Sequence, residues 1–117
     1  MSTPLTLGQK QREFTRCLAK LIEWAYSNGY ELTVGDAYRD PRVFGPMGTK
    51  MGYSHPSSNH KQRLAMDFNL FKDGKFLQSS EDHKPLGDYW KTLHPLARWG
   101  GDFNDGNHYS FEHNGVK

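Results

Sequence analysis

A histidine and an aspartate, His60 and Asp67, stand seven residues apart in the stretch SNHKQRLAMD at positions 58–67. Such side chains are tolerated on a solvated surface, but in a protein interior they must be paired or bind a metal. Their spacing alone does not decide between these cases. A second polar cluster, WGGDFNDGNHYSFEH at 99–113, places Asp105 three residues before His108.

Zinc catalysis needs three protein ligands, an open fourth position for water and a nearby base that is not itself a ligand. His60, Asp67 and His108 would complete such a ligand set, and Asp105 would then be the base. Each histidine taken singly is more often a surface or capped residue. We interpret His83, and likewise the histidine at position 94, as structural.

The N-terminal third of the chain predicts one helix and one strand. Thr6 and Gln9 have the spacing of a capping box, and apolar residues recur at helical intervals as far as Gly29, so we expect a helix over 7–28. Alternation from Tyr30 predicts a half-buried strand that ends near Tyr38. Residues 40–58 hold three prolines and three glycines without a period, which is typical of a long functional loop.

The second half predicts two paired strands, a helix and a final strand. We expect a strand over 63–71 whose even positions, from 64 to 70, face the core and whose odd face carries Asp67. Asp73-Gly74 predicts a hairpin turn into a strand at 75–77. Apolar positions 86, 89, 90, 93 and 97 indicate a helix that Pro95 must end or kink. Residues 108–113 alternate as a last strand, so the chain is a small α+β domain with helices packed on an antiparallel sheet.

Length, charge and cysteine content narrow the class of protein. The 117 residues suit one domain, and the net charge of +2 comes without a basic stripe, so a nucleic-acid partner is not expected. The single cysteine, Cys17, excludes an intramolecular disulfide and falls in the apolar pattern of the first helix. Neither an export signal nor an apolar run of membrane-spanning length is present, which predicts a cytosolic chain that does not insert into membranes.

The two clusters together resemble a family of zinc peptidases. Ser58-x-His60-x6-Asp67, with Ala65 two before the aspartate, is followed by Trp99-Gly100-Gly101-Asp102 and Asp105-x-x-His108. This pattern is similar to that of the D-alanyl-D-alanine carboxypeptidases and dipeptidases and the L-alanyl-D-glutamate endopeptidases of bacteriophage lysis. The resemblance runs from Tyr38-Arg39 to about Glu112. It implies a hedgehog/DD-peptidase-like fold with a zinc site on the sheet.

The resemblance also implies a role for each matching residue. His60, Asp67 and His108 match the zinc ligands, and Asp105 matches the catalytic acid/base. His113 is the alternative third ligand, but only His108 has a carboxylate at the family spacing. Arg39 matches the residue that would hold the scissile carbonyl, although it could instead form a surface ion pair with Asp36 or Asp40. Arg63 departs from the family pattern, because many members carry glycine at this position. We expect Ser58 and Tyr53 to contact substrate.

The activity of the family that the sequence resembles predicts the function of this chain. We expect a single catalytic domain over 1–117, without a wall-binding domain, that cuts the peptidoglycan stem peptide between L-alanine and D-glutamate. It would act as a monomer, accumulate in the host cytoplasm as a phage lysis enzyme, and reach the cell wall once the membrane is opened. The alternatives are a D-alanyl-D-alanine carboxypeptidase or dipeptidase with the same site, a non-catalytic zinc-binding module, and a small basic interaction protein that binds no metal.

Overall fold

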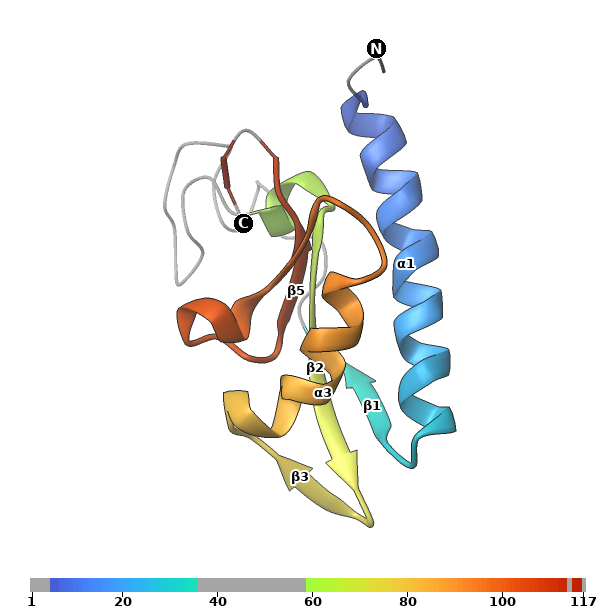
Figure 1. Cartoon of the computed structure of the whole chain (residues 1–117), viewed down its shortest axis with the longest axis vertical. Helices are drawn as coiled ribbons and strands as arrows, with labels where there is room; N and C mark the ends of the chain where they lie inside the picture. Colours follow the sequence, from blue (N-terminus) through green and yellow to red (C-terminus); the bar gives the residue numbers. More distant parts are fainter. Residues whose placement is uncertain (1–4, 36–58, 114, 117) are drawn as a thin grey trace.

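The structure is a computed structural model that describes residues 5–35, 59–113 and 115–116. These residues form a small α+β domain in which two helices pack on an antiparallel sheet (Figure 1). The elements in chain order are α1 (Leu7–Ser27), β1 (Glu31–Val34), η1 (Asn59–Gln62), β2 (Ala65–Lys72), β3 (Lys75–Leu77), α3 (Ser80–Lys91), β4 (Ala97–Trp99), η2 (Gly100–Phe103) and β5 (His108–Phe111), where η1 and η2 are short 3-10 helices.

Strand β2 organises the sheet. The described strands run in the order β1-β2-β5-β4, β3 also pairs with β2, and every pairing is antiparallel. The first half of β2 pairs with β5 and its second half pairs with β1 and β3, so β2 runs through the middle of the sheet (Figure 1).

Helix α1 begins at the predicted residue and ends at Ser27, one residue before the predicted end. Thr6 and Gln9 form the capping box, with the Thr6 side chain accepting from the Gln9 backbone N–H and the Gln9 side chain accepting from that of Thr6. Asn28 closes the helix, and Gly29 follows with a φ of +86°. The buried face of α1 consists of Phe14, Cys17, Leu18, Leu21 and Ala25, which follow the i, i+3, i+4, i+7 pattern of one helix face.

The alternation expected along β2 is confirmed at three of the four even positions, whereas Met66 is only half-buried and packs against the core. Leu64, Phe68 and Leu70 are buried in the core, whereas Asp67 lies on the opposite face, only partly buried. Asp73 and Gly74 both have positive φ, 52° and 77°, which is the backbone of the two-residue hairpin turn between β2 and β3. Successive residues of β2 therefore project alternately into the hydrophobic core and toward the polar face of the sheet.

The predicted helix beyond residue 86 is wrong at its C-terminal end. Helix α3 ends at Lys91, and Ala97, which we expected to be helical, begins strand β4. Pro95 cannot continue a helix, and β4 pairs with β5 instead, with Ala97 opposite Phe111. The expected element order therefore lacked one short strand. Its last residue, Trp99, packs directly on Gly87 of α3, where a Cβ would lie 2.1 Å from the indole ring.

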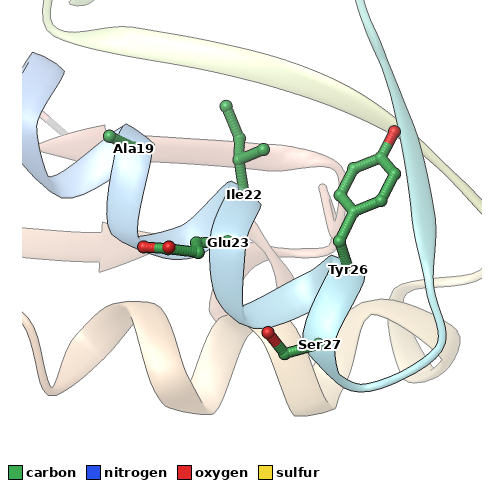
Figure 2. Close-up of a pocket in the computed structure, with 5 residues that line it drawn as sticks. All are labelled: Ala19, Ile22, Glu23, Tyr26 and Ser27. Atoms are coloured by element: carbon green, nitrogen blue, oxygen red, sulfur yellow. The ribbon is translucent and has the colours of Figure 1, made fainter.

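Side chains from the C-terminal half of α1 line a pocket (Figure 2). Its lining includes Tyr26, whose hydroxyl is 3.3 Å from both the N and the O of Leu32 in β1. The other lining residues in Figure 2 are Ala19, Ile22, Glu23 and Ser27. None of the described helices combines the length and the apolar character that a membrane span requires.

Candidate metal centre

Three side chains that are distant in the sequence meet beside the pairing of β2 and β5. One ligand atom from each of His60, Asp67 and His108 lies within 4.8 Å of the other two. His60 Nε2 is 3.2 Å from Asp67 Oδ1, and His108 Nδ1 is 3.4 Å from the same oxygen. The structure thus brings together the three ligands selected from the sequence, and this group can hold a metal ion.

The sheet itself positions two of the three ligands. Asp67 on β2 and His108 on β5 are partners in the antiparallel register. Side chains that are directly opposite on an antiparallel pair project from the same face of the sheet. The next residue on each strand, Phe68 and Tyr109, points the other way and is buried in the core. Core packing on one face therefore fixes the ligands on the other.

A tight turn positions His60. The residue lies on η1, and Arg63 after it has a φ of +59°, which directs the chain from η1 into β2. Leu64 then enters the core, and its carbonyl accepts from the Phe111 backbone N–H at 2.9 Å. On the other side of the turn, the Gln11 side chain of α1 donates to the Gln62 carbonyl at 2.8 Å. These contacts hold the turn against both β5 and α1.

The distances between the ligand atoms suit a small tetrahedral ion. Two ligands at zinc–nitrogen and zinc–oxygen distances of about 2.0–2.1 Å are roughly 3.3–3.4 Å apart at the tetrahedral angle. The His60–Asp67 and Asp67–His108 separations, 3.2 and 3.4 Å, match that value. The two imidazoles meet edge to face, with ring centroids 5.1 Å apart.

The three side chains are largely buried, and the carboxylate of Asp67 is held in its ionised form, which favours cation binding. His60 is 1% exposed and His108 is 7% exposed. Burial raises the pKa of Asp67, but the His108 and His60 rings beside the carboxyl outweigh that effect and lower the pKa to about 2. The carboxylate is therefore ionised at neutral pH, as a metal ligand must be.

Asp105 lies next to the metal-binding group but outside it. Its Oδ2 is 3.9 Å from His108 Nδ1, and its side chain is 54% exposed. The Asp105 backbone N–H donates to Gly100 at 2.7 Å, and the His108 N–H donates to the Asp105 carbonyl at 3.0 Å. The carboxylate is thus held at the solvent side of the group, where it can exchange a proton with a molecule bound there.

Gly100 is a positioning residue that the sequence analysis did not single out. A Cβ at this position would lie 1.9 Å from the Asp105 carbonyl oxygen and 2.7 Å from His108 Cβ. No larger residue lets the two segments approach this closely. The only sequence signal for this role is the glycine pair at the start of the second cluster.

The remaining described histidines lie elsewhere. His113, the rival third ligand, has its Nδ1 3.0 Å from Lys10 Nζ and is not in the metal-binding group. His83 is buried with its Nδ1 2.8 Å from the Tyr109 hydroxyl. His94 Nε2 is 3.0 Å from a Glu13 carboxylate oxygen. The contacts of His83 and His94 agree with the structural roles expected of them.

Three of the predicted site residues lie outside the described residues. Arg39, expected to hold the scissile carbonyl, and Tyr53 and Ser58, expected to contact substrate, fall in the segment 36–58. Their predicted roles therefore stay predictions. The described part of the site consists of the metal-binding group, Asp105 and the glycine beside it.

The sequence was also compared with known proteins. No protein-family model matches the chain, and no curated protein matches it significantly. The functional argument therefore depends on the geometry of the site and on the motif pattern.

Proposed function

We propose that the chain is a zinc peptidase that hydrolyses the stem peptide of peptidoglycan between L-alanine and D-glutamate, as a lysis enzyme of a bacteriophage. One observation carries the proposal: two histidines and an aspartate converge on one point while a second carboxylate, Asp105, lies 3.9 Å from one of those histidines. Three protein ligands beside a separate base are the components of a hydrolytic zinc site.

The ligand set favours zinc over the hard cations. Calcium and magnesium prefer sites made of oxygen ligands, whereas two imidazoles and one carboxylate suit zinc. The same ligand types bind iron in oxygenases. Asp105 supports zinc, because a base beside the ligands is useful for hydrolysis.

The residues of the chain divide the proposed reaction between them. His60, Asp67 and His108 would hold the ion, which when bound supplies the Lewis acidity that activates water and polarises a peptide carbonyl. Asp105 accepts the proton of the attacking water as the C–O bond forms. It then donates that proton to the nitrogen as the C–N bond breaks, which yields a carboxylic acid and a free amine. Proton transfer of this kind contributes about 10²–10⁴-fold to the rate.

The motif pattern supports peptidoglycan as substrate. The segments around His60 and Asp105 carry the spacings shared with the peptidases of cell-wall stem peptides. In the proposed setting the chain accumulates in the host cytoplasm as a monomer. It reaches the wall only after another protein opens the membrane.

The test is digestion of purified peptidoglycan followed by mass spectrometry of the products. The proposal predicts new N-terminal D-glutamate, with no product from a His60→Ala variant that lacks one ligand. Release of D-alanine would instead identify a carboxypeptidase or dipeptidase with the same site. A chain that binds zinc but releases neither product would be a non-catalytic zinc-binding module.

A further inference from the structure

A polar cavity of about 260 Å³ adjoins Asp105 on the side of the β2–β3 hairpin. It lies between that hairpin, the start of α3 and the turn before β5. Its volume is below the roughly 300–1,000 Å³ of pockets that enclose a whole drug-sized ligand, so it suits one part of a larger substrate. The described residues that line it are Phe68, Asn69, Phe76, Leu77, Gln78, Ser80, His83, Asn104, Asp105, Gly106 and Asn107.

The wall of this cavity is fixed by close backbone packing. The Gly106 N–H donates to the Ser80 hydroxyl at 3.0 Å, and the Gly106 carbonyl accepts from the Trp99 indole at 2.7 Å. A Cβ on Gly106 would lie 2.3 Å from Ser80 Cα. The turn that carries Asp105 is therefore seated on the first turn of α3, which fixes one wall of the cavity, while other lining residues, such as Gln78 and Asn104, are exposed.

His83 provides an unused hydrogen-bonding atom in the cavity lining. The residue is 1% exposed, and its Nδ1 is 2.8 Å from the Tyr109 hydroxyl. Among the residues that the structure describes, none forms a hydrogen bond with its Nε2. Among the described residues this Nε2 is not one of the fully buried polar atoms without a partner, so it is accessible to a bound molecule. A bound molecule with a hydroxyl or amide group could supply that partner.

The charges around the cavity select a neutral ligand. Asp105 is an anion, and the described lining contains neither lysine nor arginine. Burial lowers the pKa of His83, so its ring is neutral at pH 7. The other polar contributors are the side-chain amides of Asn69, Gln78 and two further asparagines. Such a lining suits hydroxyl and amide groups and disfavours carboxylates.

We infer that this cavity is a subsite for the N-acetylated sugar to which the stem peptide is attached. The inference rests on the proposed function, because it assumes that the substrate is peptidoglycan. On one side of the scissile bond the stem carries the carboxylates of D-glutamate and of the residues after it. On the other side, L-alanine is joined to a sugar whose acetamido and hydroxyl groups are neutral. Only the sugar side matches the cavity, and the half-exposed Phe76 ring adds an apolar surface for it.

The direct test is a titration of the whole protein with N-acetylmuramyl-L-alanine, followed by NMR. We expect shifts of the side-chain amide signals of Asn69, Gln78, Asn104 and Asn107 and of the His83 ring. N-acetyl-L-alanine, which lacks the sugar, should leave these signals in place. An absence of shifts with the sugar compound, or equal shifts with both compounds, would overturn the subsite.

A variant pair connects the cavity to catalysis. Gln78→Phe fills the cavity from an exposed position, and Lys75→Phe adds the same ring to the same hairpin outside the lining. The wild type and Lys75→Phe should show a kcat/KM at least roughly tenfold higher for a sugar-bearing stem peptide than for the sugar-free peptide, a ratio that two ordinary hydrogen bonds provide. In Gln78→Phe the ratio should fall to about one. An unchanged ratio in Gln78→Phe would contradict the inference.

The two experiments separate this inference from the proposed function. Sugar binding without hydrolysis of either peptide would leave the subsite in place and remove the peptidase assignment. Hydrolysis of both peptides at equal rates, without NMR shifts, would leave the peptidase and remove the subsite.

Discussion

Asp67 and His108 face each other across the antiparallel register of β2 and β5, with His108 Nδ1 3.4 Å from Asp67 Oδ1. Because side chains alternate along a strand, a slip of one residue in either strand would turn one ligand into the core. The register is held by Phe68 and Tyr109, which follow the two ligands and are buried on the opposite face. The metal-binding group is therefore a consequence of how the core packs.

Asp105→Asn should separate metal binding from catalysis. The change removes the proton acceptor 3.9 Å from His108 but leaves the three ligands in place. We expect an unchanged metal content and a kcat lower by about 10²–10⁴-fold, measured by hydrolysis of a stem peptide. Asp102→Asn, which removes an exposed carboxylate paired with Lys91, is the matched control and should retain activity. Full activity in Asp105→Asn would show that another group is the base.

Gly100→Ala should damage the site through the backbone. The new Cβ would meet the Asp105 carbonyl and His108 Cβ, so the turn must move. Overpacking of this kind lowers the free energy of unfolding by about 1–3 kcal/mol, and metal affinity should fall as His108 shifts. Urea denaturation and a zinc titration measure the two effects.

Gly8→Ala is the control for that substitution. A Cβ at Gly8 would make only an ordinary 3.4 Å contact with the Arg12 side chain, and the residue lies in α1. We expect this variant to be as stable as the wild type or more so, by up to about 1 kcal/mol. If Gly100→Ala behaves in the same way, the close approach at Gly100 is not what holds Asp105 and His108 together.

Substitutions of Arg63 should report on the turn that carries His60. Arg63 is exposed with a φ of +59°, a conformation that costs a residue with a side chain about 1–2 kcal/mol. Arg63→Gly removes that cost but adds about 0.5–1 kcal/mol of conformational entropy that must be lost on folding. The free energy of unfolding should therefore change by less than about 1 kcal/mol, and metal binding should be retained. Arg63→Val, whose branched side chain fits this conformation poorly, should lower both stability and zinc affinity. Equal behaviour of the two variants in thermal denaturation and zinc titration would contradict this role.

The buried His83 should make stability dependent on pH. Burial lowers its pKa in the folded chain below the ordinary value of 6.5, although the nearby Asp82 raises it in part. The folded state then binds fewer protons than the unfolded state, so this contribution is fully present above pH 6.5 and is lost as the pH falls through the lower folded-state pKa. In urea denaturation without metal, the wild type should lose more stability between pH 7 and pH 5 than His83→Gln does. Parallel curves for the two proteins would contradict the assignment.

The orientation of Asp67 could be predicted from the sequence because it follows from the alternation of apolar and polar residues along one strand. The alternation from Leu64 to Leu70 places Asp67 on the face away from the core, and the structure confirms that placement. The capping box of α1 and the Asp73-Gly74 turn are likewise local signals that the structure confirms.

The remainder depends on contacts between distant segments. Arginine itself gives no signal for a left-handed backbone, so the only hint of the turn at Arg63 that brings His60 to Asp67 was the glycine that many members of the similar family carry at this position. Strand β4 has only three residues, too few to show a period, and it exists through its pairing with β5. Gly100 is visible as a glycine, but its role depends on which atoms approach it in the folded chain.

The most direct measurement of the central claim is the metal content of the purified chain, determined by elemental analysis without added metal. The account predicts close to one zinc per chain in the wild type and in His113→Gln, and close to none in His108→Gln, because only His108 belongs to the metal-binding group. A wild-type chain without zinc, or one that holds iron instead, would contradict it.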